Sequence, residues 1–494
     1  MIVDGPGWVD GSTNPIRGLF PLAVEQYLNA AVSVNAPGVT TVTTTARYYA
    51  LHPLVVDEAK RRRLDTPGMR RLLRRVEVAY ALICMAHHGQ PGHHSWYPAP
   101  HGRDRLLTAL SHGPVDLAVA AGTEAGRYAK AATGFLGPYV GSETGLGLLA
   151  QGALAPGPAY DHTIVHGALG AVLDLAAASR LGLDDVRDHA ALCLCQAVTS
   201  ADGELLAGRF AGRPDEIGTV AGNLGQVMRL FATAMEQAEI RSRADLGRFV
   251  MFDPAVTEHP HSTDNWLRWR GIRLRAMSVT AWRDLFAYLC RYLNEGPMTI
   301  AQLGECLAEE LPSGTLGDFL DALPPAVDDK GAPLPAENEI AAWPAPRRHL
   351  ATILLGAQRF EALTDINGPV RLGFVGPPGR RSEKEELAPR WVHDVIADRR
   401  TQSLRDFAIW LARVMINRAH RATLAKSRYQ RDGRFTMPLR VLVQDDLVIR
   451  VHGVATGEPP LRWAQLLSMG RQTGIFQTGV DGRWEVGPRG GLLG

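Results

Sequence analysis

Residues 66–86, TPGMRRLLRRVEVAYALICMA, carry the clearest secondary-structure signal in the chain. Thr66 and Pro67 supply a cap and a first-turn proline, so a new helix is expected to begin here. The apolar side chains that follow recur three and four positions apart, at Leu72, Leu73, Val76, Ala79, Tyr80, Ile83 and Cys84. That spacing places them on one stripe of an α-helix, and such a stripe is normally buried in a core. The segment therefore predicts a fold built from packed helices.

The same helical periodicity continues along much of the remaining sequence. It predicts helices at about residues 162–201, 217–237, 278–294, 299–311 and 403–426. Two β-hairpins are expected near the end of the sequence, turning at Asp445-Asp446 and at Asp481-Gly482. The expected fold class is therefore mainly α and multi-domain, with a small α+β C-terminal module of hairpins plus helices.

A length of 494 residues predicts two to four domains. Breaks rich in proline, glycine and histidine then suggest four segments. They are an N-terminal segment and basic helical region (1–86), a central helical domain (87–323), a proline-rich connector with linking segments (324–400) and the C-terminal α+β module (401–494).

One part of the central domain, at 298–323, resembles a helix-turn-helix or winged-helix unit. Thr299 is placed to cap a first helix, and Pro312-Ser313-Gly314 then turns the chain into a second. Asp318 and Asp321 make that second helix acidic, which argues against insertion into a major groove. We therefore expect this unit to contact protein.

Composition indicates an ordinary globular protein, with 46% apolar residues, 21% charged residues and a mean hydropathy of −0.08. Neither a basic-apolar leader at the start nor an apolar run of about 20 residues is present, so no membrane partner is expected. Five cysteines, mostly in apolar helical context, fit reduced thiols in the cytoplasm. A net charge of only +2 means that any nucleic-acid binding must use local patches.

No complete catalytic motif is present, so no reaction or cofactor is predicted. The sequence has no Gly-Lys pair, which excludes a phosphate-binding P-loop, and no Gly-x-Ser-x-Gly nucleophile elbow. Glu58-Ala59-Lys60 matches the Glu-x-Lys of restriction-type nucleases, but it lies in a basic helical stretch without a strand.

The loop HHGQPGHHSWYPAPHG at 87–102 holds the most conspicuous candidate metal ligands, His87, His88, His93 and His94. Cys84, one helical turn before His88, could add a thiolate. The loop lacks the close ligand pairs and carboxylates of known zinc sites, so we expect an exposed loop without metal. The alternative is a metal-dependent hydrolase or nuclease. A second motif, TEHPHSTDN at 257–265, has similar residues and is expected to be a chance occurrence.

Three clusters of basic residues are the better functional signal. Residues 60–75 contain eight cations, and the pairs Arg70/Arg74 and Arg71/Arg75 are expected to share a face opposite the apolar stripe. Residues 266–275 interleave tryptophan with arginine, and residues 413–434 form a basic helix end and tail. Such like charges favour a phosphate backbone between them. The candidate nucleic-acid-binding residues are Arg61, Arg62, Arg70, Arg71, Arg74, Arg75, Arg268, Arg270, Arg418, Arg421, Lys426 and Arg428.

The 53 basic residues are almost all arginine, and the alternative for each cluster is a solvated arginine face in a GC-rich gene. The three clusters together favour binding to nucleic acid, with duplex DNA as the expected partner.

The stretch VTTVTTTARYYALHP at 39–53 resembles a family of uncharacterised prokaryotic proteins encoded beside anti-phage defence genes. The matching residues are Thr43, Thr45, Ala46, Arg47, Tyr48, Tyr49 and Pro53. LRWAQLLSMGRQTGIF at 461–476 is similar to the same group at Arg462, Gly470, Gln472 and Gly474. The resemblance implies a cytoplasmic member of a multi-gene defence system that acts in a complex with other protein subunits.

We therefore expect a DNA-binding or scaffolding subunit of a bacterial anti-phage defence or DNA-processing complex. The metal-dependent hydrolase and a structural partner protein without nucleic-acid affinity are the alternatives. Arg47 is expected to be buried against carboxylate or carbonyl acceptors and to have a structural role, the alternative being a phosphate contact.

Overall fold

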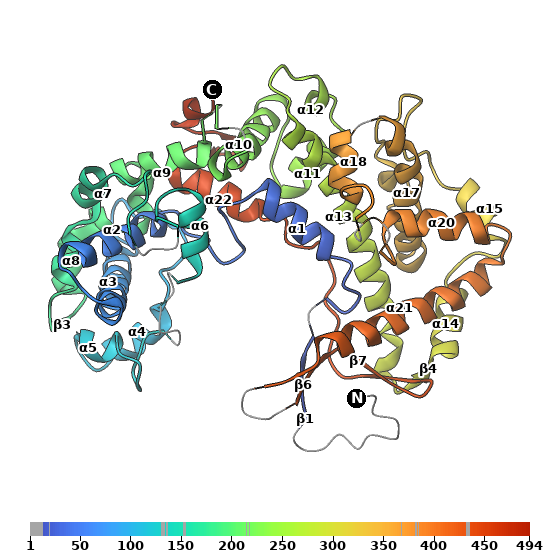
Figure 1. Cartoon of the computed structure of the whole chain (residues 1–494), viewed down its shortest axis with the longest axis horizontal. Helices are drawn as coiled ribbons and strands as arrows, with labels where there is room; N and C mark the ends of the chain where they lie inside the picture. The colour runs from blue at the N-terminus through green and yellow to red at the C-terminus, as the bar shows by residue number, and fades with distance from the viewer. Residues whose placement is uncertain are drawn as a thin grey trace. The chain divides into compact units, whose positions relative to one another are not determined.

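Each of the two structural units of the chain is assembled from two separate stretches of sequence (Figure 1). Unit 1 comprises residues 1–32 and 250–459, and unit 2 comprises residues 33–249 and 460–494. The computed structural model describes residues 13–18, 20–129, 134, 137–151, 155–213, 215–216, 218–366, 368–380, 383, 385–430 and 435–494. Helix accounts for 58% and strand for 7%, which confirms the mainly α, multi-domain class.

Unit 2 contains the helical hairpin that residues 66–86 predict. Helix α2 (Tyr48–Arg61) is followed after a short turn by α3 (Thr66–His87). The cap of α3 is Asp65, one residue before the predicted Thr66, and its carboxylate accepts a hydrogen bond from the Gly68 amide at 2.7 Å. The predicted apolar stripe is buried along its whole length. Burial of that stripe, together with the cap, explains why the chain is helical here.

Shorter elements surround this hairpin. The α-helices of unit 2 are α4 (Arg103–Leu110), α5 (Leu117–Ala120), α6 (Val140–Gly145), α7 (His162–Leu169), α8 (Ala171–Leu175), α9 (Ala201–Ala211), α10 (Val220–Gln237) and α22 (Trp463–Thr473). Its 3₁₀ segments are η1 (Gly137–Tyr139), η2 (Asp184–Leu192), η3 (Leu194–Val198) and η5 (Gly490–Leu493). Strand β2 (Val115–Asp116) pairs with β3 (Arg180–Leu181), and β9 (Phe476–Thr478) pairs with β10 (Trp484–Val486), both antiparallel.

The helix expected over 162–201 is wrong in detail. The chain forms α7 and α8, then β3, and then the two 3₁₀ segments η2 and η3. Backbone pairing of β3 interrupts the helical path, and His189 has non-helical dihedral angles inside η2. The spacing of apolar residues there indicates which side chains are buried, and several short helical turns bury them as well as one long helix would.

Unit 1 is centred on α13 (Asp264–Leu289), which packs against α17 (Ala345–Ile366) and α18 (Gly368–Val375). Their shared core consists of Met251, Leu274, Phe360, Leu363, Val370, Phe374 and Val375. Further helices of this unit are α12 (Ala255–Glu258), η4 (Tyr292–Asn294), α14 (Ile300–Glu309), α15 (Leu316–Asp321), α16 (Ala336–Glu339), α20 (Pro389–Arg399) and α21 (Leu404–Lys426). Two helices, α1 (Gln26–Asn35) and α11 (Arg243–Phe252), run across the boundaries between the units.

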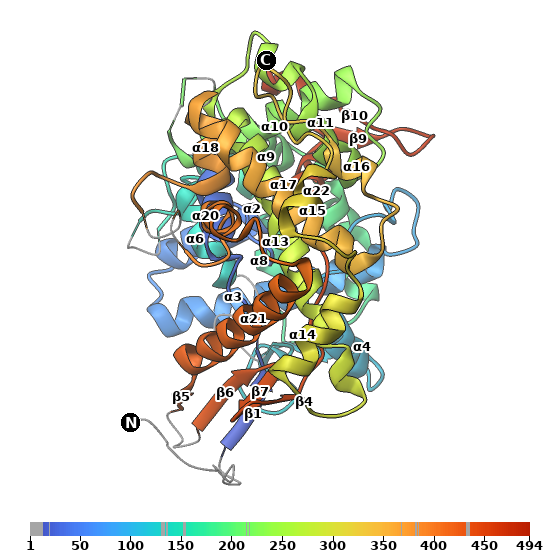
Figure 2. The ribbon, with the colours of Figure 1, turned by 90° about the vertical axis from the view of Figure 1, so that its right-hand side faces the viewer.

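Two small sheets complete unit 1, and Figure 2 shows their strands near α14 and α21. One sheet has the order β4-β8-β7, formed by β4 (Met298–Thr299), β8 (Leu447–Arg450) and β7 (Val441–Gln444). In the other, β6 (Phe435–Leu439) pairs with β5 (Arg428–Tyr429) and, in parallel, with β1 (Thr13–Arg17). Both predicted hairpin turns, at Asp445-Asp446 and at Asp481-Gly482, are present.

The elements around β4 have the order of a winged helix, but the second helix is not the expected one. Helix α14 begins at the predicted Thr299 cap and packs tightly on α21, where Gly304 lies against Ile409. The hairpin β7–β8 follows α21 after β5 and β6, and its strand β8 pairs with β4. The expected partner, α15, is a six-residue helix at the start of an intervening segment, residues 310–403. Because residues 310–403 separate α14 from α21, the local sequence pattern does not reveal that these two helices pack together.

The compact units do not coincide with the four predicted segments. The predicted C-terminal module contributes β7 and β8 to unit 1, and α22, β9 and β10 to unit 2. Stretches rich in proline, glycine and histidine indicate loops, whereas the units are defined by contacts between residues far apart in the sequence. None of the helices that the structure describes has both the length and the apolar character needed to span a bilayer.

A Gly271→Ala substitution is expected to destabilise unit 1, because α13 and α18 cross there with their backbones in contact. A methyl group at Gly271 would lie 2.7 Å from the Phe374 amide nitrogen, and closer still to the Val370 carbonyl oxygen. Such overpacking costs about 1–3 kcal/mol or more. Thermal unfolding should show a lower midpoint. A methyl group at Gly368 on α18 would face open space, so Gly368→Ala should change the free energy of unfolding by less than about 0.5 kcal/mol. Equal losses of stability in the two variants would contradict the close backbone contact at Gly271.

Candidate functional site

The turn between α2 and α3 collects exposed positive charge. Its cations are Lys60, Arg61, Arg62, Arg63, Arg70 and Arg71, which we call the basic corner, and all six are exposed. The turn is tight because Arg63 adopts a left-handed conformation with φ = 54°, and the Leu64 amide donates to the Ala59 carbonyl at 2.9 Å. This closure ends α2 and starts α3 within four residues, so both helix ends present their cations to solvent.

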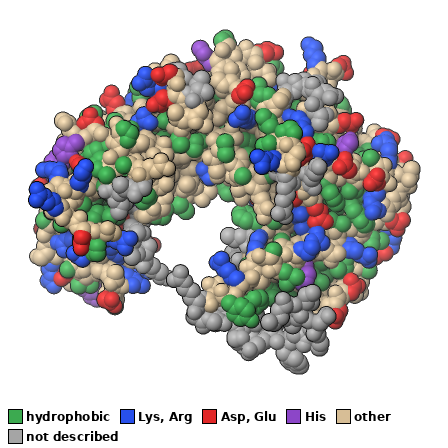
Figure 3. Space-filling model, in the orientation of Figure 1, with side chains coloured by type: hydrophobic (Ala, Val, Ile, Leu, Met, Phe, Trp, Pro, Cys, Tyr) green, Lys and Arg blue, Asp and Glu red, His purple; other side chains and the backbone are tan. Residues whose placement is uncertain are grey.

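Only part of this charge is neutralised within the chain. Glu58 accepts hydrogen bonds from Arg61 at 3.0 Å and from Arg62 at 2.5 Å. Within the described residues, no carboxylate lies within ion-pair distance of Lys60, Arg63, Arg70 or Arg71. Figure 3 shows Lys and Arg side chains on the surface over α3 and its neighbours. Four cations of the corner therefore remain uncompensated by any carboxylate in the described part of the chain.

Arg74 and Arg75 do not share the exposed face that the sequence predicts. Arg74 is buried and donates to the carbonyl oxygens of Ala121 and Gly122, each at 2.5 Å. Arg75 donates to the carbonyl of Ala176 at 2.7 Å, at the end of α8. Both guanidiniums thus satisfy carbonyls that helix ends leave without partners. These two arginines are engaged in holding α5 and α8 against α3.

The cluster at 266–275 also points largely inward. Trp266 and Trp269 are fully buried, so neither can stack on a base. Arg270 is buried and donates to the carbonyl of Val250 at 3.1 Å, while Arg268 is partly buried. These residues belong to the core of unit 1.

The third cluster is mostly compensated. Arg418 donates to the Leu22 carbonyl and is paired with Glu385 and Glu386, and Glu386 also accepts from Arg421 at 2.5 Å. Lys426 donates to the carbonyl of Phe20 at 3.0 Å, while Arg428 is exposed. Among the predicted binding residues, the basic corner is therefore the largest group with accessible charge.

A second site, at the other end of α3, brings together four side chains, Cys84, His87, Cys193 and Cys195, which we call the Cys–His cluster. The Cys195 sulfur lies 3.4 Å from His87 Nδ1 and 3.5 Å from the Cys193 sulfur. The Cys84 sulfur accepts a hydrogen bond from the Leu194 amide at 3.4 Å and adjoins the Cys193 thiol. All four side chains are buried, and no disulfide joins them. The Cys193 thiol and burial raise the pKa of Cys195 well above its usual range.

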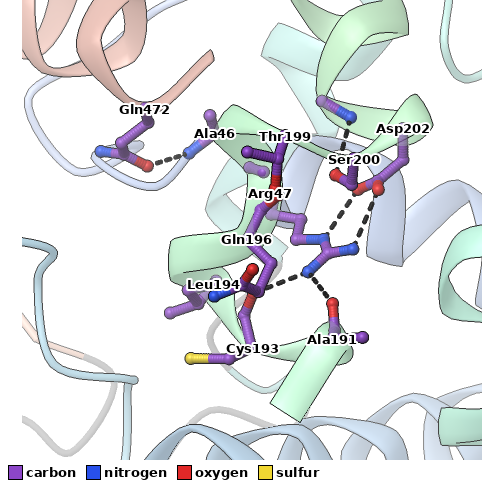
Figure 4. Close-up of polar contacts among 12 residues, drawn as sticks. Ala46, Arg47, Ala191, Cys193, Leu194, Gln196, Thr199, Ser200, Asp202 and Gln472 are labelled. Atoms are coloured by element: carbon purple, nitrogen blue, oxygen red, sulfur yellow. Dashed lines mark hydrogen bonds and ion pairs between the residues drawn. The ribbon is translucent and has the colours of Figure 1, made fainter. Parts of the chain in front are cut away.

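Arg47 holds the turn that carries Cys193 (Figure 4). Its guanidinium is 1% exposed, forms a two-pronged ion pair with Asp202 at 2.8 and 2.9 Å, and donates to the carbonyls of Ala191 and Cys193 at 2.9 and 2.6 Å. The prediction that Arg47 is buried against carboxylate or carbonyl acceptors is confirmed.

The expectation of an exposed histidine loop is wrong in part: His87 is buried in the cluster, and His93 and His94 are partly buried beside it. The His93 ring is 4.9 Å from that of His88 and 5.5 Å from that of His87. Burial, followed by the neighbouring His88, His87 and His94, lowers the pKa of His93. A cavity of about 70 Å³ is lined by His88 and His93, by Tyr97, and by the three thiols of the cluster.

In the described part of the chain, His87, Cys193 and Cys195 are the one group of three or more His, Cys or acidic side chains whose donor atoms are close enough to share a metal. The 257–265 motif does not form such a group. His259 Nδ1 accepts a hydrogen bond from the His261 amide at 3.2 Å, and its ring lies against Trp266. Glu58 and Lys60 of the nuclease-like motif lie on α2, as expected.

Comparison with protein-family models, with curated proteins and with solved structures finds no match. Cys193 and Cys195 were not among the predicted site residues. The pairs Cys84-x-x-His87 and Cys193-x-Cys195 are the signal that could have found them, because close pairs of donors are typical of zinc sites.

An Arg47→Ala substitution is expected to destabilise unit 2 strongly, because it leaves the buried Asp202 carboxylate and two carbonyls without their donor. Breaking a buried ion pair in this way costs about 3–5 kcal/mol. Thermal unfolding should show a much lower midpoint and a smaller soluble yield. Arg187→Ala, which breaks the exposed pair with Asp184, is the matched control and should cost at most about 1 kcal/mol. A melt of the Arg47 variant that overlays the parent protein would disprove this structural role.

Proposed function

We propose that this chain is a DNA-binding subunit that holds the phosphate backbone of duplex DNA at the basic corner. The observation that carries the proposal is a group of four exposed cations at one helix turn, Lys60, Arg63, Arg70 and Arg71, which have no acidic partner among the residues that the structure describes. Like charges at such short spacing repel one another, and a polyanion relieves that repulsion. The contacts would be to phosphates, so little sequence preference is expected.

The backbone of Arg63 gives independent support. A non-glycine residue in the left-handed region costs about 1 kcal/mol, and glycine is the usual residue at such a helix end. Here that position holds an exposed arginine with φ = 54°. Conformational strain retained at an exposed charged residue suggests that its side chain has a use other than stability.

The winged-helix elements of unit 1 are a weaker candidate for the DNA contact. The tip of the β7–β8 hairpin is acidic, with Asp445 and Asp446, and would repel phosphates. On α21, Arg405 is paired with Glu305, and Arg421 with Glu386. This part of the chain is better suited to contacts with protein than with phosphates.

The wider role that we propose is membership of a bacterial anti-phage defence or DNA-processing complex. The support is the resemblance at residues 39–53 and 461–476 together with the basic corner. Other protein subunits would then supply any catalytic activity, since the chain has no complete catalytic motif.

Replacing Arg70 and Arg71 together by Ala should weaken duplex DNA binding and reduce its salt dependence. Each phosphate that the variant no longer neutralises makes the slope of log K against log [salt] shallower by about 0.9, so a decrease of up to about two units is expected. Fluorescence anisotropy titrations at several salt concentrations measure this slope. Arg187 and Arg213, exposed but paired with Asp184 and Asp215, provide the control double variant. No binding by the parent protein, or an equal change in both double variants, would reject the proposal.

Arg63→Gly separates binding from stability, because the two should change in opposite directions. Glycine relieves the left-handed strain, so the midpoint of thermal unfolding should rise or stay level, with a gain of up to about 1 kcal/mol. Removal of one cation should nevertheless reduce affinity for DNA. If affinity is unchanged, Arg63 does not contact the phosphate backbone.

A further inference from the structure

We propose that the Cys–His cluster binds one zinc ion through Cys84, His87, Cys193 and Cys195, as a closed structural site. This inference does not rest on DNA binding. The two sites lie at opposite ends of α3, and Arg70 and His87 are roughly 25 Å apart along the helix axis.

The separations between donor atoms fit a tetrahedral ion. With Zn–S bonds of about 2.3 Å and Zn–N bonds of about 2.0–2.1 Å, neighbouring ligands of a tetrahedron lie about 3.5–3.8 Å apart. The observed separations are 3.5 Å between the sulfurs of Cys193 and Cys195, and 3.4 Å between Cys195 and His87 Nδ1. The donor atoms of His87, Cys193 and Cys195 all lie within 4.8 Å of one another. Cys84 lies outside this group of three, so its side chain would have to move inward to join an ion that the other three bind.

His87 is oriented as a metal ligand. Its Nε2 lies 3.4 Å from the Pro91 carbonyl oxygen, which can only accept a hydrogen bond. The tautomer with its proton on Nε2 satisfies this contact and leaves the Nδ1 lone pair directed at the Cys195 sulfur, 3.4 Å away. Zinc-binding histidines normally use their second nitrogen in this way to fix the tautomer and the ring orientation.

Cys84 is the fourth ligand that best completes the set. It lies one turn before His87 on α3. Its sulfur adjoins that of Cys193 and accepts a hydrogen bond from the Leu194 amide. An N–H donor to a ligating sulfur is the usual outer contact of a thiolate site. On binding, the three thiols release three protons to solvent and their thiolates bond to Zn²⁺, with no redox change.

The three sulfur donors and one nitrogen donor favour zinc as the metal and a structural role for the site. Three thiolates and one imidazole suit zinc, whereas magnesium, calcium and manganese prefer oxygen ligands. Four protein ligands leave no open position for water or substrate, which is the pattern of structural rather than hydrolytic sites. The ion would join the last turn of α3 to the turn at 193–195, whose backbone Arg47 already holds.

Metal analysis of the full-length protein, expressed in zinc-supplemented medium without a metal-binding tag, tests the proposal. We expect about one zinc ion per chain, and X-ray absorption should show about three sulfur and one nitrogen neighbours. This measurement on the unsubstituted protein needs no variant to fold. Removal of zinc by a chelator should lower the midpoint of thermal unfolding, and added Zn²⁺ should restore it.

Variants then identify the ligands. Cys193→Ser combined with Cys195→Ser should lose the zinc. Cys290→Ser, which alters another buried thiol in unit 1, should retain it. His93→Ala combined with His94→Ala should also retain it, because these two histidines lie outside the proposed set. Less than about a tenth of a zinc ion per chain in the parent protein would overturn the site, and loss of zinc in the His93/His94 variant would overturn the ligand set.

Discussion

Unit 2 depends on the buried ion pair between Arg47 and Asp202. A guanidinium and a carboxylate removed from water are costly unless every hydrogen-bonding group finds a partner. Here Nε and Nη2 bind the two oxygens of Asp202, and Nη1 binds two backbone carbonyls. Asp202 lies in the first turn of α9, where the helix dipole favours a negative charge. One side chain thus fixes the start of α2, the start of α9 and the turn at 191–193 with respect to one another.

Local patterns were sufficient to predict much of the helical structure. The helix α3 follows from the apolar spacing between Leu72 and Cys84, and α14 follows from its Thr299 cap. Both hairpins follow from β-forming runs around short acidic turns. The burial of Arg47 could be inferred because its apolar and aromatic neighbours, Ala46, Tyr48 and Tyr49, are all core residues.

The candidate sites were less predictable, because they depend on segments far away in the sequence. Nothing near Arg74 indicates that the end of α5 will cover it, so its charge resembles that of Arg70 in the sequence. The same applies to Arg418, whose carboxylate partners come from residues 385 and 386. In the Cys–His cluster, more than a hundred residues separate the ligand pair on α3 from the pair at 193–195. Sequence shows which charges and donors exist, but not which of them a distant segment will meet.

The discontinuous units have a consequence for biosynthesis. A ribosome delivers residues 33–249 long before α22, so unit 2 lacks a buried helix until residues 460–494 have emerged. Strand β1 likewise waits for β6, the only strand that pairs with it among the described residues, until residue 439 has been made. Contacts that span so much of the chain form slowly, and unpaired strands and apolar faces invite association during the delay. Nascent chains of this protein should therefore need protection by chaperones, and cutting the gene between residues 249 and 250 would leave both units incomplete.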